Sequence, residues 1–246
     1  AAAIGVTGEY EERACALFDA GIHYLCLDVA HGHHVLVKNA LKTLRELFGD
    51  TVHLMAGNVA TLEAFNDLAD WGANSIRVGI GGGSICSTRI NTGHGVPTFQ
   101  SIHDCSYSDR DAKIIADGGI KNSGDIVKAL AAGADFVMLG SMLAGTDESP
   151  GEIFTSVNKK YKVYRGMASR SAQLDWRGKS SSPEGISTTI PYKGPVSDIL
   201  RDIGGNIRSG FSYTGARDLR ELQSKAIFIR QTSASQIESS THILRR

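Results

Sequence analysis

The feature that most constrains the fold of this chain is a pattern that repeats along its first half. A short apolar run ends in Gly, Asp or Asn, and a segment with helical periodicity follows it. Such alternation predicts βαβ units and a parallel sheet. The runs are apolar throughout, which is typical of strands covered on both faces. The predicted strands lie within residues 1–6, 24–33, 52–60, 75–83, 113–120 and 135–141, and the clearest helices within 35–49, 61–72 and 123–133, the last with Ser123 as N-cap and Gly133 as C-cap.

Polar residues gather where these predicted strands end. Asp28, Asn58, Gly79, Asp117 and Ser141 all stand at such positions. A doubly wound sheet binds its ligand at one switch point, whereas a (β/α)8 TIM barrel uses the carboxyl ends of all its strands. We therefore predict an α/β fold of the barrel type. A closed barrel needs eight strands, so we expect its first two βα units to lie outside these residues.

The second half of the chain has a different character. The periodicity breaks near residue 150, and residues 175–195 are rich in Gly, Ser, Thr and Pro. A long irregular segment of this kind is typical of a lid or binding loop, so an active-site flap is predicted there. A helix-like stretch follows over 196–215, and residues 232–246 resemble a C-terminal arm. We expect residues 1–246 to form a single catalytic barrel domain.

Charge and cysteine content narrow the class of protein. Lys plus Arg and Asp plus Glu both number 26, which predicts neither a nucleic-acid nor a membrane partner. No apolar run approaches the ~20 residues that span a bilayer. The four cysteines lack CxxC spacing, and Cys15 and Cys26 stand among apolar residues, so both should be buried and reduced. A cytoplasmic enzyme fits these observations, unless a targeting signal lies outside these residues.

The stretch GIGGGSICSTR, residues 79–89, has the strongest chemical interest. Its glycines allow positive φ and close approach of the backbone to a ligand. Cys86 at its tip is either a nucleophile, activated by backbone N–H groups, or a structural loop cysteine. Thr88, two residues later, could hydrogen-bond a leaving group or a water.

Two pairs of small residues, each containing glycine, suggest an anion site. Gly118–Gly119 and Gly140–Ser141 end adjacent predicted strands, and backbone amides there form the usual phosphate site of a barrel. The alternative is that these glycines only make tight turns. Asp117 could bind a ribose diol or cap a turn, and Glu184 reads as a solvated loop charge from the pattern alone. His33 and His34 are adjacent, without helical metal-ligand spacing, so metal catalysis is disfavoured.

Together, several stretches resemble the family of inosine-monophosphate dehydrogenases and guanosine-monophosphate reductases. The resemblance implies an eight-stranded barrel, a catalytic Cys86 that attacks purine C2, and a catalytic Thr88. It covers nearly the whole chain in the family's order. The stretches are DVAHGH, MAGNVAT, RVGIGGGSICSTR, TGHGVP, IADGGIKNSGDIVKALAAGADFVMLGSMLAGTDESPGE, YRGMAS, PEG, PYKG and SYTGARDLREL.

The resemblance also implies roles for individual residues. Asp117 would bind the ribose hydroxyls, while Met167 and Glu184 would meet the purine base. The carbonyls of Gly81, Gly83 and Cys86 would hold a potassium ion, as in the dehydrogenases. The nucleotide phosphate would lie on Ser84, Gly119, Gly140, Ser141 and Tyr164, within substrate motifs that include Gly118, Gly166 and Gly185, and the nicotinamide cofactor on Asp28, Asn58, Arg77 and Gly79.

The two branches of the family share the cysteine adduct and then diverge. The dehydrogenases oxidise IMP to XMP with NAD and activate water with an Arg-Tyr pair, which residues 168–182 lack. This favours a GMP reductase that uses NADPH, as do PYKGPVSDILRDI and SYTGA. Against it stand the histidine in DVAHGH and Arg170, which occupies the place of an expected glutamate and leaves the partner of Thr88 unassigned.

IMP dehydrogenase is therefore the alternative to GMP reductase. A nucleotide-binding protein that has lost its chemistry is a third reading, motivated by Arg170 and the missing flap base. The resemblance further implies a homotetramer.

Overall fold

Six parallel strands form the main sheet of the computed structural model, which describes residues 1–241 apart from the side chain of Arg177. The strands lie side by side in chain order, as the alternating pattern predicts. Each of these six strands falls within a predicted run. They are β1 (Ala2–Ile4), β2 (Tyr24–Asp28), β3 (His53–Val59), β4 (Ser75–Val78), β5 (Lys113–Asp117) and β6 (Phe136–Met138).

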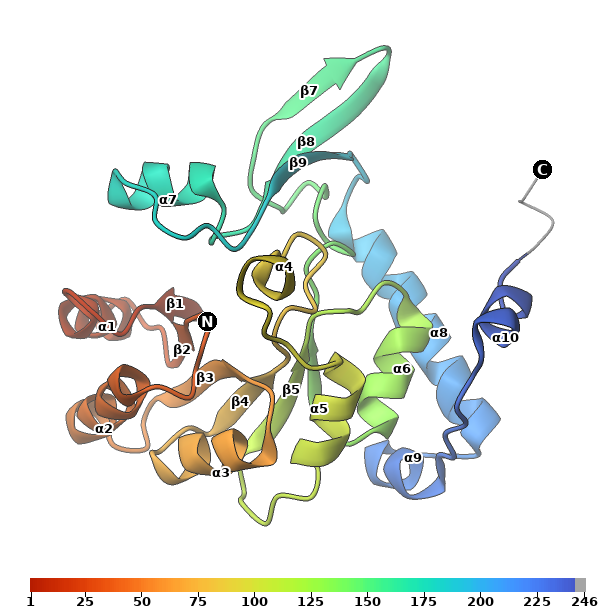
Figure 1. The fold of residues 1–246 in the computed structure, drawn as a ribbon, viewed down its shortest axis with the longest axis horizontal. Coiled ribbons are helices and arrows are strands. Elements are labelled where there is room, and N and C mark those ends of the chain that lie inside the picture. The colour runs from red at the N-terminus through yellow and green to blue at the C-terminus, as the bar shows by residue number, and fades with distance from the viewer. Residues whose placement is uncertain (242–246) are drawn as a thin grey trace.

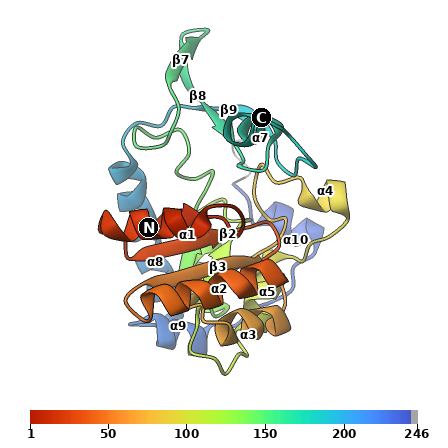
Figure 2. The same ribbon diagram turned by 90° about the vertical axis from the view of Figure 1, so that its left-hand side faces the viewer.

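Helices connect these strands and cover one face of the curled sheet (Figures 1 and 2). Asn122, rather than Ser123, caps the helix after β5, because its side chain accepts the Asp125 amide at 2.9 Å. A short helix, α4 (Thr88–Thr92), follows the cysteine. The covering helices are α1 (Tyr10–Asp19), α2 (Val35–Phe48), α3 (Leu62–Asp70), α5 (Thr98–Cys105) and α6 (Ser123–Ala131).

The core lies between the sheet and these helices. Leu25 and Leu27 of β2 are fully buried, and so is Leu41 of α2. Cys26, between the two leucines, is also buried, which explains why this strand is apolar without alternation. Cys15 differs from the prediction: it is only half-buried, because it flanks the buried Ala14 on α1. All four cysteines are free thiols.

The predicted barrel type is confirmed for the part of the chain described. In a (β/α)8 barrel the strands follow chain order, as these six do. Within residues 1–241, β1 pairs only with β2, and β6 only with β5. The described residues thus provide six of the eight strands of such a barrel, and two further βα units before β1 remain a prediction.

A second, antiparallel sheet stands at the carboxyl end of the first. It consists of β7 (Ile153–Ser156), β8 (Lys159–Arg165) and β9 (Ser187–Pro191), with α7 (Arg170–Arg177) between β8 and β9. The hairpin β7–β8 projects away from the parallel strands (Figure 1). The prediction of an irregular 175–195 is wrong for β9, since the β-branched run there pairs with β8, a partner distant in sequence.

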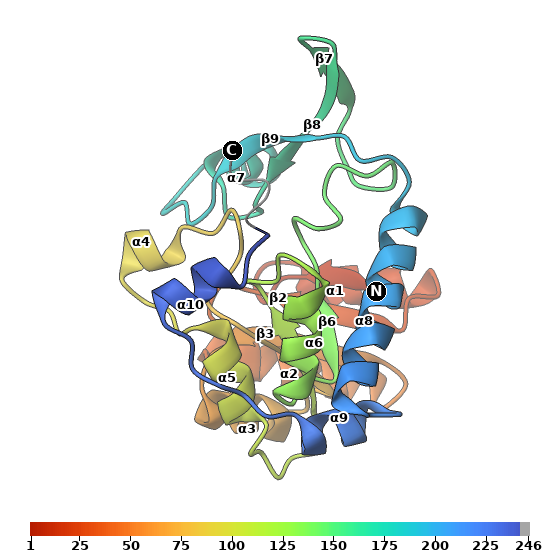
Figure 3. The ribbon, with the colours of Figure 1, turned by 90° about the vertical axis from the view of Figure 1, so that its right-hand side faces the viewer.

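The chain ends on the helical side. The predicted helix after residue 195 is α8 (Val196–Thr214), which packs on α6 and leads to α9 (Leu219–Lys225) (Figure 3). The predicted arm starts with α10 (Ser233–Glu238), and its residues 242–246 lie outside the described part. Just before α10, Phe228 packs against Phe99 of α5 with ring centroids 4.9 Å apart. No helix among the described residues is long and apolar enough to cross a bilayer.

Candidate active site

A cavity of about 280 Å³ lies at the carboxyl ends of β4, β5 and β6. Segments distant in sequence build it: the cysteine loop, the turns after β5 and β6, the end of β8 with the residues that follow it, and the residues before β9. The cavity thus brings together all eleven residues predicted to bind the substrate. Its walls include Ser84, Asp117, Gly118, Gly119, Gly140, Ser141, Tyr164, Gly166, Met167, Glu184 and Gly185, together with Gly83 and Cys86.

A chain of hydrogen bonds leads away from the cysteine. The half-buried Cys86 thiol donates to Thr88 Oγ1 over 3.2 Å, and the Thr88 hydroxyl donates to Glu184 Oε2 over 2.6 Å. A proton on the sulfur is therefore two short steps from a carboxylate. Glu184 is thus the hydrogen-bond partner of Thr88 that the sequence leaves unassigned. Arg170 begins α7 and is not among the described residues that line the cavity.

The backbone explains why Glu184 reaches Thr88. The Ser87 amide donates to the Glu184 carbonyl (2.8 Å), and the Ile186 amide donates to the Ile85 carbonyl (3.0 Å). Asn91 Nδ2 adds a bond to the Pro183 carbonyl at 2.7 Å. The segment before β9 thus lies antiparallel along the cysteine loop and delivers the carboxylate to the start of α4.

The glycine-rich loops pack backbone against backbone. Gly118 has a φ of +92°, and a Cβ there would lie 2.9 Å from the Gly83 nitrogen. A side chain at Gly118 would therefore push the cysteine loop out of place. This glycine makes a tight turn and also lets the turn after β5 support the loop that carries Cys86.

Hydroxyls and glycines meet on one side of the cavity. Ser84 Oγ lies 3.3 Å from Tyr164 Oη, and a Cβ at Gly140 would come within 3.1 Å of that same phenol oxygen. Gly119 and Ser141 line the same cavity. Two strand-end turns and two hydroxyls are the donors that a phosphate monoester needs. The cavity wall also contains residues that the sequence did not point to, and their only signal is that they lie in or beside the glycine and YRGM motifs. They are Gly82, Ile85, Ile120, Lys121, Met138 and Ala168.

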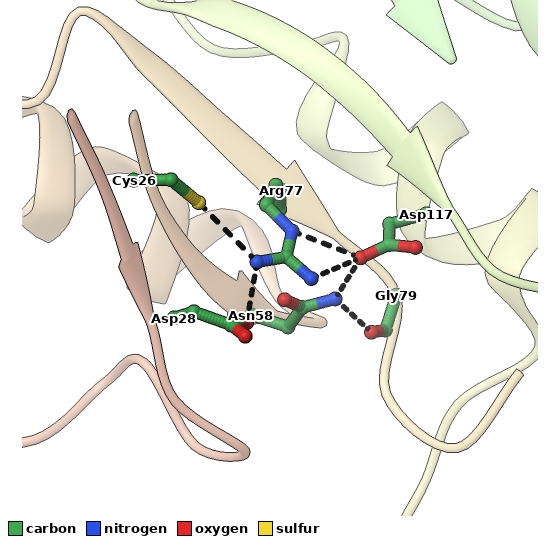
Figure 4. Close-up of polar contacts among 6 residues, drawn as sticks. All are labelled: Cys26, Asp28, Asn58, Arg77, Gly79 and Asp117. Carbon is green, nitrogen blue, oxygen red and sulfur yellow. Dashed lines mark hydrogen bonds and ion pairs between the residues drawn. The ribbon is translucent and has the colours of Figure 1, made fainter. Parts of the chain in front are cut away.

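The predicted cofactor residues form a second cluster beside the cavity (Figure 4). Asp117 Oδ2 accepts three hydrogen bonds: from Arg77 Nε (3.0 Å), Arg77 Nη2 (2.9 Å) and Asn58 Nδ2 (2.8 Å). Asn58 Nδ2 also donates to the Gly79 carbonyl at 2.8 Å. Within the described residues, the other carboxylate oxygen of Asp117 has no hydrogen-bond partner, and Asp117 lines the cavity.

Arg77 joins this cluster to β2. Its Nη1 donates to Asp28 Oδ1 at 2.5 Å and contacts the Cys26 sulfur at 3.4 Å. Burial by itself would lower the pKa of Arg77, but the carboxylates of Asp117 and Asp28 outweigh it and hold that pKa above its ordinary value. Burial raises the pKa of the Cys26 thiol, which is therefore neutral.

Of the residues predicted to bind the nicotinamide cofactor, Asp28 is available to it, whereas the carbonyls predicted to bind potassium are partly occupied. The Asp28 side chain is 40% exposed, so its carboxylate can accept the amide N–H of a nicotinamide. The carbonyls of Gly81, Gly83 and Cys86 are hard oxygen donors suited to potassium. However, Gly83 already accepts the Cys86 amide at 3.1 Å, and Arg89 Nη2 donates to Val96 O at 2.6 Å beside this loop. The potassium site stays a prediction.

The histidine motif has other partners. His33 Nε2 lies 2.8 Å from Asp67 Oδ2, and His34 caps α2 by accepting the Leu36 amide. Residues 1–241 contain no group of three or more His, Cys, Asp or Glu side chains that could hold a metal.

Known proteins are similar to this chain in sequence and fold. The family model described as "IMP dehydrogenase / GMP reductase domain" matches residues 1–242. Inosine-5'-monophosphate dehydrogenase from Bacillus subtilis is 47% identical over 98% of this chain and 51% of its own length. GMP reductase from Leishmania major is 44% identical over 98% of this chain and 52% of its own length.

A crystal structure of GMP reductase C318A from Trypanosoma brucei in complex with guanosine 5'-monophosphate has the same fold. It superposes with a TM-score of 0.92 at 43% identity, over 98% of this chain and 51% of its own. The chain thus spans about half the length of the relatives it matches.

Proposed function

The chain belongs to the IMP dehydrogenase / GMP reductase family of purine-nucleotide oxidoreductases, and from this we propose that the complete protein is a GMP reductase. It converts GMP to IMP and ammonia with NADPH as reductant. The observation that carries the proposal is the chain of hydrogen bonds from Cys86 through Thr88 to Glu184.

Glu184 generates the nucleophile through Thr88. The Glu184 carboxylate accepts a proton from the Thr88 hydroxyl while Thr88 takes the proton of the Cys86 thiol, so the sulfur becomes a thiolate and Glu184 becomes neutral. The thiolate attacks C2 of the guanine ring and forms a C–S bond. The same proton then returns through Thr88 to the 2-amino group, which departs as ammonia and leaves a thioimidate on Cys86.

The second half of the reaction breaks the C–S bond. NADPH supplies the hydride that C2 receives, and Cys86 leaves as a thiolate, which gives IMP. A proton from water then restores the Cys86 thiol for the next cycle, and Glu184 serves as base and acid in turn.

Other residues of the cavity wall bind the phosphate, the ribose and the base of the nucleotide. Ser84, Tyr164, Gly119, Gly140 and Ser141 hold the phosphate. Asp117 accepts the ribose hydroxyls with the carboxylate oxygen that Arg77 and Asn58 leave free, since their bonds all go to Oδ2. Gly118, Gly166, Met167 and Gly185 complete the wall around the base.

The cofactor lies on the side of Asp28, Asn58, Arg77 and Gly79. Asp28 accepts a hydrogen bond from the carboxamide N–H of the nicotinamide, and Gly79 lies beside the reacting carbon.

Potassium on the carbonyls of Gly81, Gly83 and Cys86 belongs to the same proposal, and replacing potassium chloride with sodium chloride in the assay tests it. The other parts of the proposal are a homotetramer, which light scattering measures, and a cytoplasmic location, which cell fractionation measures.

IMP dehydrogenase, which oxidises IMP to XMP with NAD, is the second candidate. It is favoured by the identity of 47% to a dehydrogenase and by the histidine in DVAHGH. The reductase is preferred because residues 168–182 contain no Arg-Tyr pair. Those residues form α7 and a short turn, in which the Ser181 amide donates to Gln173 Oε1 at 2.8 Å.

The absorbance of reduced nicotinamide tests the branch directly in the complete protein. Consumption of NADPH with GMP, together with release of ammonia, is the expected result. Production of NADH from IMP and NAD would contradict it and identify a dehydrogenase. Nucleotide binding without either reaction would mean that the chain binds purine nucleotides and has lost its chemistry.

A further inference from the structure

The loop between β6 and β7 carries Gly140 and Ser141 at one end and is tied down at the other. The Lys193 amide donates to the Gly145 carbonyl at 2.9 Å, and the Asp147 amide donates to the Gly194 carbonyl at 3.0 Å. The connection from β9 to α8 thus runs beside this loop (Figure 3).

A buried lysine fixes the same end independently. The Lys162 ammonium, on β8, donates to the carbonyls of Thr146 and Ser149, both at 2.8 Å. Lys162 is only 4% exposed, so these bonds are shielded from water. Residues 145–149 therefore keep their place whatever happens at the cavity end of the loop.

The cavity end has a single side-chain support. The Lys193 ammonium donates to the Ser141 carbonyl at 2.7 Å and to the Met142 carbonyl at 3.0 Å. Among the described residues, no other side chain bonds to the backbone of these two. Otherwise the turn is held by its own bonds, from the Leu143 and Ala144 amides to the Gly140 carbonyl.

The position of the ammonium has two physical effects. A peptide unit is planar, so fixing the Ser141 carbonyl also fixes the amide N–H of the next residue. A positive charge at the carbonyl end of a helical turn also offsets the partial negative charge there, which favours an anion at the amide end. Both effects improve the turn as a binding site for a phosphate.

We propose that Lys193 is a positioning residue for the phosphate monoester of the substrate, acting through the Gly140–Met142 turn. The inference rests on the proposed function only in that the cavity must bind a nucleotide monophosphate. It concerns binding of the phosphate and leaves the Cys86 relay untouched.

Three variants of the complete protein test it: Lys193→Met, Lys193→Arg and Tyr192→Phe. Methionine keeps the length of the stem and removes the donors, whereas arginine can still donate to two carbonyls. Tyr192→Phe is the matched control, because the Tyr192 hydroxyl donates to Asp147 Oδ1 at 2.6 Å, at the end of the loop that the Lys193 side chain does not contact. Calorimetry with each variant combined with Cys86→Ala, in which no adduct forms, gives the dissociation constants of GMP and IMP. Steady-state assays of the same variants with Cys86 present give KM and kcat.

Lys193→Met should weaken GMP and IMP binding by the same factor, about tenfold, since both carry the phosphate and two charged hydrogen bonds are lost. The KM for GMP should rise accordingly, with kcat and the KM for NADPH unchanged. Lys193→Arg should restore most of the affinity, and Tyr192→Phe should bind like the wild type.

Wild-type affinity in Lys193→Met would overturn the inference, as would an equal loss in Tyr192→Phe or a fall in kcat at constant KM. A wild-type protein that binds GMP but neither reduces GMP with NADPH nor oxidises IMP with NAD would refute the proposed function alone. If the wild type bound neither nucleotide, both proposals would fall.

Discussion

At the scale of single residues, the proposed mechanism gives Cys86 the role of nucleophile and Glu184 that of acid and base. Replacing Cys86 by Ala should abolish turnover, because it is the only cysteine among the described residues that line the cavity. GMP should still bind, since the phosphate and ribose contacts lie on other residues. Steady-state assays and calorimetry on the same preparation measure both. Turnover that survives the substitution would disprove covalent catalysis.

Glu184→Gln keeps the shape of the side chain and removes the base. Because Thr88 would then have no proton acceptor, turnover should fall by about 100- to 10,000-fold. The affinity for GMP should change much less than kcat. A matched control is Glu148→Gln, at a carboxylate that caps α8 by accepting the Val196 amide outside the cavity. Equal activity in Glu184→Gln and the wild type would exclude the relay.

Arg77 is important for stability as well as for the site. Its side chain is 15% exposed and that of Asp117 17%. Arg77→Met would remove two of the three hydrogen bonds to the largely buried Asp117 carboxylate and the one from Arg77 to Asp28. Removing one partner of such a pair costs about 3–5 kcal/mol of unfolding free energy. Chemical denaturation measures this loss. The exposed pair of Arg110 with Asp70 provides the control, and Arg110→Met should cost far less.

At the scale of elements, the site depends on loops that pack without side chains. Gly118→Ala should reduce turnover sharply, because the new Cβ would lie 2.9 Å from backbone atoms of Gly82 and Gly83. The strain of a positive φ adds about 1–3 kcal/mol. Gly8→Ala is the matched control: its φ is +68°, but nothing lies within 4 Å of the new Cβ. Loss of activity in both variants alike would mean that φ strain, and not loop packing, is responsible.

Elements formed by local sequence were predictable, and those formed by distant pairing were not. The strands β2 to β6 and the helices α2, α3 and α6 follow from periodicity and caps within a few residues of each other. The strand β9 is visible only once β8 is beside it. For the same reason the pattern around Glu184 suggests a solvated charge, although the carboxylate lies 2.6 Å from a hydroxyl 96 positions earlier.

At the scale of the whole molecule, the parallel strands supply the polar carboxyl ends and the later segments close over them. The sequence could predict the first of these layers, because successive strands of a barrel meet at one edge. It could not predict that Lys193 would bond to Ser141, since that contact needs the return of the chain from β9. The cavity exists only when both layers are in place.

Stability of the whole fold should depend on pH through His53 on β3. Burial, and then the nearby Arg45 cation, lower the pKa of His53 below its ordinary 6.5. The unfolded chain therefore binds this proton more readily than the folded one. Stability from His53 is fully present above pH 6.5 and is lost as the pH falls toward the lowered pKa.

Thermal melting between about pH 5 and pH 8 measures this effect. His53→Asn keeps a polar group near Ser75 Oγ, which lies 2.8 Å from His53 Nε2, and should show a weaker dependence of Tm on pH than the wild type. Identical dependence in the two proteins would show that His53 titrates as it does in the unfolded chain.

Covalent catalysis by Cys86 can be observed in the intact mass of the protein, quenched in denaturant while it turns over GMP. We expect a species heavier by the nucleotide less ammonia, with the added mass on the peptide that contains Cys86 and absent from Cys86→Ala. Turnover of GMP with only the unmodified mass, and no adduct at any time after mixing, would contradict covalent catalysis.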